Sequence, residues 1–482
     1  MQISVIGVAI VLALFLLGRL VGSTLIVAMM ASLAFGSTAI VTLSALGGAS
    51  PLVYVGFSAL VCAGAVFEPA TRRHALACFQ SRWEPWVVVA LAVYACASAL
   101  IMPRLFAGQT NVFVTSRDIG VVEVALTPGN GNLTQTCYFL LGSMTFLAVI
   151  GFVGAEGRFS VLRRAFLTWA AVDAAGGLID IVGKTIGAGD LLAPVRTASY
   201  ALLTDVEHEG FSRIAGAYSE ASAFAIGSLP ALAFALTDWR RTGSRFSGGL
   251  AAILLALLVL STSSTAYAGL TVLGIVLVVQ MARSLAVGRV RTKDALILIG
   301  GAAAVTVVVG LMVWDPHTLD AATNLFQGTV VDKLQSESGR ERSHWNERSL
   351  VSFMDTNGIG VGFGSSRASN WLVAVVSQLG LVGSLLQVIL LLPLLHAVRA
   401  PQDRAPQTQA ADLHASLRSC LFACVLGGVI SGGTPDPGLL FFCALAGMTA
   451  CRMVLAPRRP IRLETAVRPR WLMPPRPLHD VG

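Results

Sequence analysis

The stretch Trp86-Val-Val-Val-Ala-Leu-Ala-Val-Tyr-Ala-Cys-Ala-Ser-Ala-Leu-Ile-Met102 contains no charged residue and is almost entirely apolar. Its length approaches the ~20 apolar residues with which an α-helix crosses a bilayer. Similar runs recur near residues 3–18, 20–44, 51–69, 86–102, 134–154, 165–183, 214–237, 247–262, 265–282, 294–314, 370–396, 419–434 and 438–455. We therefore predict an all-α polytopic membrane protein with about 12–13 transmembrane spans.

The composition of the 482 residues agrees with this class, because 55% are hydrophobic, only 12% are charged and the mean hydropathy is +0.73. Soluble globular domains carry about 25% charged residues, so a soluble fold is excluded. The eight cysteines form no Cys-x-x-Cys pair and no Cys/His cluster with metal-ligand spacing. The sequence indicates neither a metal nor a soluble cofactor.

Lysine and arginine are distributed unevenly between the loops. Counting Arg19, 24 of the 34 basic residues fall in the segments 72–84, 155–164, 238–246, 283–293 and 397–418 and in the tail from 452. Because cytoplasmic loops are enriched in Lys and Arg, we place these segments on the cytoplasmic side of the cytoplasmic (inner) membrane. The pI near 9.3 then reflects topology and contacts with acidic membrane lipids, and it does not indicate nucleic-acid binding.

One membrane domain, residues 1–456, is expected to precede a Pro/Arg-rich cytoplasmic tail, 457–482, with the composition of a disordered segment. The loops on the outer side hold the remaining features. These are turns within 103–133, a helix in the interface plane at 191–206, and the largest loop, 315–369, with helices near 321–335 and 340–354.

Four charged residues lie at or near membrane depth, where ionisable groups are costly. Asp173 and Asp180 share one face of a predicted span, and Arg213 and Glu220 share one face of the next. The two spans run antiparallel, so Asp180 comes level with Arg213, and Asp173 comes level with Glu220 about 10 Å deeper. Two interpretations stay open: ion pairs that fix helix register, or a polar pocket in which Arg213 is free to bind an anion.

Arginines and glycines also gather in Ser338-Gly-Arg-Glu-Arg-Ser-His-Trp-Asn-Glu-Arg348 and in Gly358-Ile-Gly-Val-Gly-Phe-Gly-Ser-Ser-Arg-Ala-Ser-Asn370. Glycine amides can approach a ligand closely, and the guanidinium fork can bind two phosphate oxygens at once. We therefore predict a diphosphate site formed by Arg213, Arg340, Arg342, Arg367, Gly362 and Gly364. A flexible re-entrant loop is the alternative interpretation of the glycine tract. It is not a P-loop, because no Gly-Lys-Ser/Thr follows.

These stretches resemble the O-antigen ligase and polymerase superfamily, membrane glycosyltransferases that act on polyprenyl-diphosphate-linked glycans. The resemblance covers roughly residues 200–390 and rests on the order of its motifs. The matching residues are Arg213, Gly216, Tyr218 and Glu220, then Ser261-Thr-Ser-Ser-Thr265, then Ser338-Gly-Arg340, Arg342, Trp345, Gly360-Val-Gly-Phe-Gly-Ser365 and Gly380-Leu-Val-Gly383. An arginine that often follows the Ser/Thr-rich junction in the family is missing here.

The resemblance implies a helical fold of the C-type glycosyltransferase kind, capped by the large outer loop. It also implies metal-independent, inverting transfer of glycan in cell-surface or exopolysaccharide synthesis, with other polysaccharide-assembly proteins as candidate partners. Ligases that pass glycan to a lipid acceptor commonly carry a His before the Asn that opens the late span, whereas this chain has Ser369-Asn370. That departure favours a polysaccharide polymerase over a ligase.

The residues themselves indicate how such a transfer would proceed. A lipid diphosphate that leaves a sugar develops negative charge, which preorganised arginines stabilise without a metal. A carboxylate near the acceptor hydroxyl would take its proton. Glu220 is the candidate, with Asp173 as its depth-matched neighbour, and His344 and His208 are weaker candidates.

Two other functional classes stay open. A secondary transporter or flippase would also use membrane-embedded charges and broken helices, but the chain shows no convincing internal repeat and its charges cluster outward. A non-catalytic partner in polysaccharide assembly is the third class. Loss of activity on neutralising Arg213 in folded protein would separate an enzyme from a scaffold, and dependence on an ion gradient would favour transport.

Overall fold

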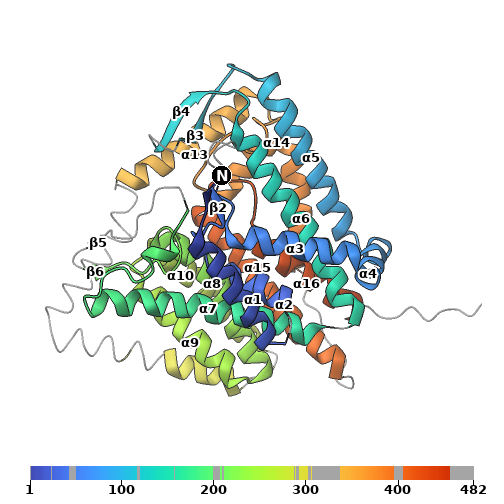
Figure 1. Ribbon diagram of the computed structural model, residues 1–482, viewed down its shortest axis with the longest axis vertical. Coiled ribbons are helices and arrows are strands. Elements are labelled where there is room, and N and C mark those ends of the chain that lie inside the picture. Colours follow the sequence, from blue (N-terminus) through green and yellow to red (C-terminus); the bar gives the residue numbers. More distant parts are fainter. Residues whose placement is uncertain are drawn as a thin grey trace, which may run out of the picture.

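The computed structural model describes residues 2–22, 24–42, 50–116, 120–156, 158–198, 207–208, 211–286, 288, 292–301, 306, 337–395 and 405–455. These residues form a bundle of helices with short strands at its periphery (Figure 1). Seven of the described helices are long and apolar enough to cross a membrane, and one bent helix pair raises the number to eight if it counts as a single span. The predicted class, a helical multi-pass membrane protein, is therefore confirmed.

The seven long helices are α5 (Glu84–Leu105), α6 (Asn130–Glu156), α7 (Phe159–Thr185), α8 (Ala221–Thr242), α10 (Ser264–Ala286), α14 (Trp371–Leu391, continued by the 3-10 turn Leu392–Leu395) and α15 (Ala405–Ser431). Shorter apolar helices are α1 (Val5–Leu20), α9 (Arg245–Leu260) and α16 (Leu439–Leu455). The core between them is aromatic and aliphatic; for example, the rings of Phe166 in α7 and Phe234 in α8 stack at 5.0 Å.

The predicted span at 51–69 becomes α3 (Val53–Phe67), which is followed by a sharp bend into α4 (Pro69–Ser81). The axes of the two helices differ by 91°. Glu68 between them is extended, and Pro69 cannot donate the hydrogen bond that would continue α3.

The prediction of a continuous span across 20–44 is wrong. Only α2 (Thr24–Ser32) is helical there, and the chain then turns so that β2 (Val41–Thr42) pairs with β1 (Gln2–Ile3). Hydrogen bonds to distant parts of the chain hold this non-helical segment. The buried Ser37 hydroxyl donates to the Ala217 carbonyl (2.9 Å), and the Thr38 hydroxyl donates to the Val195 carbonyl (2.8 Å). Non-helical backbone is tolerated inside a membrane protein where other protein groups satisfy it. The interrupted span therefore supports the chain that leads to Arg213.

The outer loops form a small lobe at one end of the molecule, which we call the outer lobe (Figure 1). It consists of α13 (Glu337–Asp355) and the antiparallel hairpin of β3 (Asn111–Ser116) and β4 (Gly120–Ala125), in which Asn111 pairs with Ala125. The helix predicted near 340–354 is thereby confirmed. The polar loop predicted at 103–133 contains this hairpin, because residues 111–116 and 121–124 are rich in β-branched side chains. The turn residues near 128–132 lead into α6, which begins at Asn130.

The remaining predicted outer elements are described only in part. Within 191–206 the described residues contain the 3-10 turn Ala193–Val195 and no longer helix, and 199–206 lie outside the described residues. The short strands β5 (Glu207–His208) and β6 (Phe211–Ser212) pair with each other just before Arg213. The helix predicted at 321–335 and the tail 457–482 lie outside the described residues.

Ion pairs agree with the predicted sidedness of the loops. Six of them join residues in or beside the segments placed on the cytoplasmic side, such as Arg452 and Glu84 (2.6 Å). Four others join residues placed on the outer side, such as Arg348 and Glu123 (3.1 Å). The fold thus brings together helix ends that the distribution of basic residues assigns to one side.

Candidate functional site

Arg213 lies in a non-helical segment between β6 and α8, and the end of α7 holds its backbone. The carboxylate of Asp180 accepts hydrogen bonds from the amides of Ala215 (2.7 Å) and Gly216 (3.0 Å). Gly216 has a φ of +58°, and a Cβ atom there would lie 3.0 Å from the ring of Phe224, so this turn requires glycine. The segment therefore has a fixed shape before any ligand binds.

The half-buried Lys184 and the buried Arg196 complete this support and pair with Asp180. The Nζ of Lys184 lies 3.1 Å from the Asp180 carboxylate and donates to the carbonyl of Arg213 (2.6 Å). The guanidinium of Arg196 lies 3.6 Å from the same carboxylate and donates to the carbonyl of Gly216 (3.1 Å). Asp180 thus lies level with Arg213, as predicted, but its ion-pair partners are Lys184 and Arg196.

Asp180 therefore does not form an ion pair with the side chain of Arg213. Its Nε atom is buried and forms no hydrogen bond with any residue that the structure describes. Burial lowers the pKa of its guanidinium, the carboxylate of Glu220 opposes this, and the charge of Arg342 lowers the pKa further. A cation that is partly desolvated and lacks a hydrogen-bonded carboxylate is prepared to bind an anionic ligand.

Arg367 lies in the loop before α14 and interacts with the same two charged residues as Arg213, namely Glu220 and Arg342. Its amide donates to the carbonyl of Phe113 (2.8 Å), and its guanidinium carbon lies 5.5 Å from the ring centroid of Trp345. Its Nε atom is also buried without a hydrogen-bond partner among the described residues. Burial lowers the pKa of Arg367, Glu220 raises it and Arg342 lowers it.

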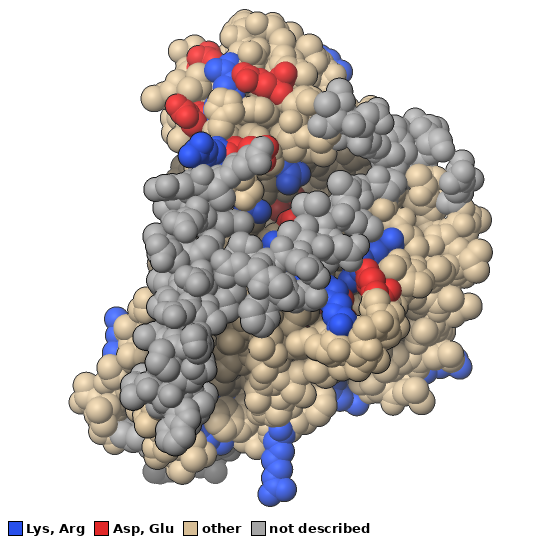
Figure 2. Space-filling view, turned by 90° about the vertical axis from the view of Figure 1, so that its left-hand side faces the viewer, with Lys and Arg blue, Asp and Glu red and all other residues tan. Residues whose placement is uncertain are grey.

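Arg213, Glu220, Arg342 and Arg367 therefore share one electrostatic neighbourhood, which we call the arginine cluster. Its members come from the entrance of α8, from α13 and from the loop before α14. Figure 2 shows basic and acidic side chains together inside a hollow below the outer lobe. Three positive charges and one negative charge leave an excess that a diphosphate would neutralise.

Glu220 occupies the N-cap position of α8, with φ −160° and ψ 164°. The hydroxyl of Ser222 donates to its carboxylate. A negative charge at the start of a helix is favoured by the helix dipole. Glu220 is partly exposed, so its carboxylate can meet a ligand that occupies the arginine cluster.

Asp173 has a different environment from Glu220. Its side chain is only 2% exposed, and its two oxygens accept hydrogen bonds from the hydroxyls of Tyr218 (2.9 Å) and Ser228 (2.6 Å). No described hydrogen bond or ion pair joins Asp173 to Glu220, so the predicted depth match does not produce a contact. The geometry gives Asp173 a positioning role, in which it holds Tyr218 and with it the segment from Arg213 to Glu220.

Arg340 and Arg342 are separated by their positions on α13. Arg342 is partly buried, and its charge lowers the pKa of Arg213 and of Arg367. Arg340 is exposed and forms no hydrogen bond or ion pair with the residues that the structure describes. Two positions correspond to about 200° around a helix, so the side chains leave opposite faces. The structure brings Arg342 to the cluster and leaves Arg340 outside, and helical periodicity could have shown this in advance.

The glycine tract has a packing role. Gly362 and Gly364 have φ angles of +97° and +78°, and added Cβ atoms would lie 2.7 Å from the Ser98 carbonyl oxygen and 2.5 Å from the Gly131 carbonyl oxygen. Their amides already donate to the backbone and side-chain oxygens of Gln378 (3.0 and 2.8 Å). The prediction that Gly362 and Gly364 bind a diphosphate through their amides is therefore not supported by the geometry.

Other candidates in the outer lobe join α13 to the β-hairpin. The ring of His344 lies edge-on to Phe113, with centroids 5.3 Å apart, and the guanidinium of Arg348 pairs with Glu123 (3.1 Å). These contacts give His344 and Arg348 structural roles. The side chain of His208 lies outside the described residues.

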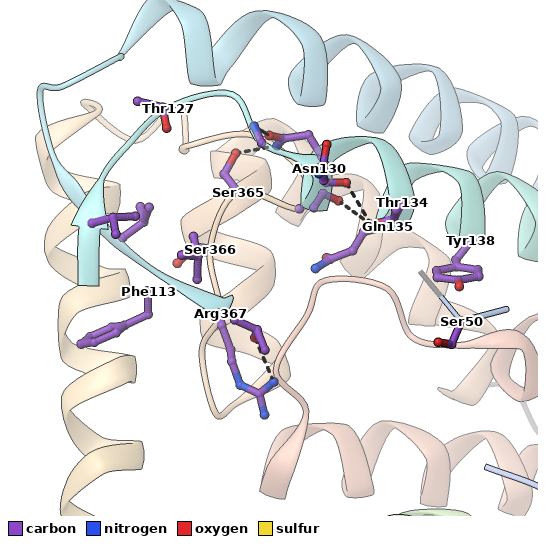
Figure 3. A pocket seen from close by; sticks show the side chains of 18 of the residues that line it. Ser50, Phe113, Thr127, Asn130, Thr134, Gln135, Tyr138, Ser365, Ser366 and Arg367 are labelled. Carbon is purple, nitrogen blue, oxygen red and sulfur yellow. Dashed lines mark hydrogen bonds between the residues drawn. The ribbon is translucent and has the colours of Figure 1, made fainter. Parts of the chain in front are cut away.

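The sequence interpretation missed a cavity of about 660 Å³ that Arg367 also lines. The hairpin, the start of α6, residues 364–367 and residues near the start of α3 line it (Figure 3), and it is open on one side. A signal was present in the polar run Asn130-Gly-Asn-Leu-Thr134 and in Ser365-Ser366, but neither run was interpreted as the lining of a cavity.

The comparisons with known proteins assign no family, because no protein-family model matches the chain and no curated protein matches it. Within the part of the chain that the structure describes, no group of three or more His, Cys, Asp or Glu side chains could hold a metal ion. The arginine cluster and the neighbouring cavity are the features of the described structure that could bind a ligand.

Proposed function

We propose that the protein is a membrane glycosyltransferase that polymerises or transfers polyprenyl-diphosphate-linked oligosaccharide units at the outer face of the cytoplasmic membrane. The observation that carries this proposal is the arginine cluster, in which cations from separate elements share one electrostatic environment with Glu220 and two buried guanidinium Nε atoms lack a partner among the described residues. A lipid diphosphate matches both the charge of the cluster and the apolar helices beside it. The resemblance of the motifs to the ligase and polymerase superfamily supports the same substrate class.

The proposed reaction joins an acceptor hydroxyl to the donor sugar. The hydroxyl oxygen bonds to the anomeric carbon while the bond from that carbon to the diphosphate oxygen breaks. Arg213, Arg342 and Arg367 stabilise the charge that develops on the leaving polyprenyl diphosphate. Glu220 takes the proton of the hydroxyl. Attack from the face opposite to the leaving group inverts the anomeric configuration.

The polymerase form of this activity is favoured by Ser369-Asn370 at the entrance of α14. The amide of Ser369 donates to the side chain of Asn346 (2.8 Å), and the side chain of Asn370 accepts from the amide of Leu372 (2.9 Å). Both residues fix the start of α14, and neither supplies the imidazole found in many ligases. Transfer to a lipid acceptor by a ligase is the alternative within the same class.

A transporter of lipid-linked glycan is a second candidate, and the interrupted helices favour it. Besides the bend between α3 and α4, α14 contains Gly380 with φ +63° and ψ −164°, which breaks its regular geometry. Discontinuous helices that line a polar site are common in secondary transporters. Transport would use the arginine cluster for binding only, with no bond made or broken.

The two candidates predict different results for purified protein in nanodiscs or liposomes supplied with a polyprenyl-diphosphate oligosaccharide. A polymerase lengthens the lipid-linked glycan, scored by mass spectrometry without added nucleotide or metal. Arg213→Ala should be folded and inactive, and Arg104→Ala, which removes an exposed charge on the outer side, should match the wild type. Full activity in Arg213→Ala would reject the proposed site. Gradient-dependent movement of the lipid across a liposome membrane, with no longer product, would support the transporter.

A further inference from the structure

The cavity beside Arg367 has a distinct chemical character. Among the described residues that line it, Arg367 alone carries a formal charge at neutral pH. Most of the other polar groups are hydroxyls and carboxamides, and Figure 3 shows them converging from the start of α6 and from the chain between Gly364 and Arg367. The main polar side chains of the lining are those of Thr127, Asn130, Thr134, Gln135, Ser365 and Ser366.

Several of these groups are not satisfied by the fold. The Oε1 atom of Gln135, the hydroxyl of Ser366 and the Nε atom of Arg367 are buried and have no hydrogen-bond partner among the described residues. One is an acceptor, one can donate and accept, and one is a donor. Buried polar groups are normally hydrogen-bonded. Three unpaired atoms around one cavity therefore indicate a ligand that both donates and accepts hydrogen bonds, as hydroxyl groups do.

Three aromatic side chains complete the lining, those of Phe113 and two tyrosines. Tyr54 and Tyr138 both border the cavity. Tyrosine combines an apolar ring face with a polar tip, which suits a ligand that alternates C–H and O–H groups. A volume of about 660 Å³ lies within the range of sites for small organic ligands and allows more than one sugar ring.

We infer that this cavity binds an uncharged oligosaccharide segment of the glycan, one end of which meets the arginine cluster at Arg367. The inference rests on the proposed function, because Arg367 belongs to both the cluster and the cavity. A phosphate-rich ligand would leave its charge unmatched by a single arginine. A lipid tail would leave the Oε1 atom of Gln135 and the hydroxyl of Ser366 unpaired. A neutral glycan satisfies them.

Binding measurements on the intact protein in nanodiscs test the cavity apart from catalysis. The probes are neutral gluco-, galacto-, manno- and rhamno-oligosaccharides, their uronic-acid counterparts, and sugar-free polyprenyl diphosphate. We expect at least one neutral oligosaccharide to bind, and Gln135→Leu and Ser366→Ala each to weaken that binding about tenfold without changing the affinity for polyprenyl diphosphate. Gln109→Leu, which makes the first replacement on the exposed surface, is the matched control and should bind like the wild type.

The outcomes separate this inference from the proposed function. If no neutral oligosaccharide binds, or only uronic-acid probes bind, the cavity is not a neutral-glycan site even if polyprenyl diphosphate binds. If polyprenyl diphosphate fails to bind while a neutral oligosaccharide binds and depends on Gln135 and Ser366, the diphosphate function fails and the cavity assignment stands. The smaller Ser366→Ala change guards against misfolding of Gln135→Leu, and unchanged thermal unfolding of both variants confirms that the fold persists.

Discussion

The segment around Arg213 and the glycine tract from Gly358 to Gly364 both have the composition of ligand-binding loops, yet the fold uses them in opposite ways. In the tract, the amides of Gly362 and Gly364 are bound by Gln378. In the Arg213 segment the backbone is also satisfied, by Asp180 and the cations around it, but the guanidinium remains without a hydrogen-bond partner among the described residues. The tract therefore builds the fold, and the segment presents a charge.

The difference follows from the requirement that buried polar groups be paired. Glycine offers only its backbone, and a folded chain usually consumes backbone groups internally. Arginine offers five donors at the end of a long side chain, more than its own backbone neighbours can take. A site is therefore better located by which groups stay unpaired after folding than by which residue types are frequent.

Removing the presented charge should have the largest effect on activity. We expect Arg213→Ala to lower kcat by about 10²–10³-fold, roughly 3–4 kcal/mol, because it removes a preorganised donor from the leaving diphosphate. Thermal unfolding should stay close to that of the wild type, since the guanidinium makes no hydrogen bond to the described fold. If Arg213→Ala also lowers the unfolding temperature strongly, the contrast between the two segments is wrong, because Arg213 would then be a structural residue like those of the glycine tract.

A substitution in the glycine tract should lower the unfolding free energy of the protein. Gly362→Ala places a Cβ 2.7 Å from the Ser98 carbonyl oxygen at a φ of +97°, and we expect a loss of about 2–3 kcal/mol in unfolding free energy. Gly108→Ala is the matched control, because Gly108 also has a positive φ (+72°) but open space around it. It should lose only the backbone term, about 1 kcal/mol. Equal losses in the two variants, measured by chemical unfolding in detergent, would contradict a packing role for the tract.

A smaller effect should distinguish two arginines on one helix. Arg342→Ala should lower kcat/KM about tenfold, because its charge lies in the arginine cluster, and Arg340→Ala should leave kcat/KM unchanged, because its side chain points to solvent from the other face. Both variants keep the helix propensity of α13. A loss of activity on changing Arg340 alone would place the anion on the other face of α13 and redefine the cluster.

Run length and hydropathy were sufficient to predict the helical class and the positions of most of the described helices. They were insufficient where a polar contact distant in sequence decides the structure. Ser37 and Thr38 donate hydrogen bonds to carbonyls beyond residue 190, and these bonds interrupt the predicted span at 20–44. A hydropathy profile contains no information about such contacts. Of the arginines predicted to bind a diphosphate, Arg213, Arg342 and Arg367 share the arginine cluster, whereas Arg340 lies on the other face of α13. The cavity was missed because its lining combines segments more than 200 residues apart, near Gln135 and Ser366.

The smallest expected effect concerns Asp436, in the loop between α15 and α16 that supports the Arg367 half of the site. In that loop the Gly433 carbonyl accepts from the amide of Ala368 (3.1 Å), and the Pro435 carbonyl accepts from the indole of Trp371 (3.1 Å). Burial raises the pKa of Asp436 from 3.8 to about 6, against the hydrogen bond donated by the Gly438 amide. The folded protein therefore holds this proton more tightly than the unfolded chain does.

The stabilisation that Asp436 contributes should accordingly be fully present below the unfolded pKa of 3.8 and should be lost as the pH rises through about 6. Because Asp436 is only partly buried, solvent screening reduces the expected change to about 1 kcal/mol. The measurement is thermal unfolding of the wild type and Asp436→Asn between about pH 4 and pH 7, where the difference between the two proteins isolates this carboxyl group from all others. A wild type that loses stability relative to Asp436→Asn as the pH rises would show a neutral Asp436 holding the loop behind Arg367. The opposite slope would show an ionised carboxylate there, and its negative charge would then count among those that balance the arginines.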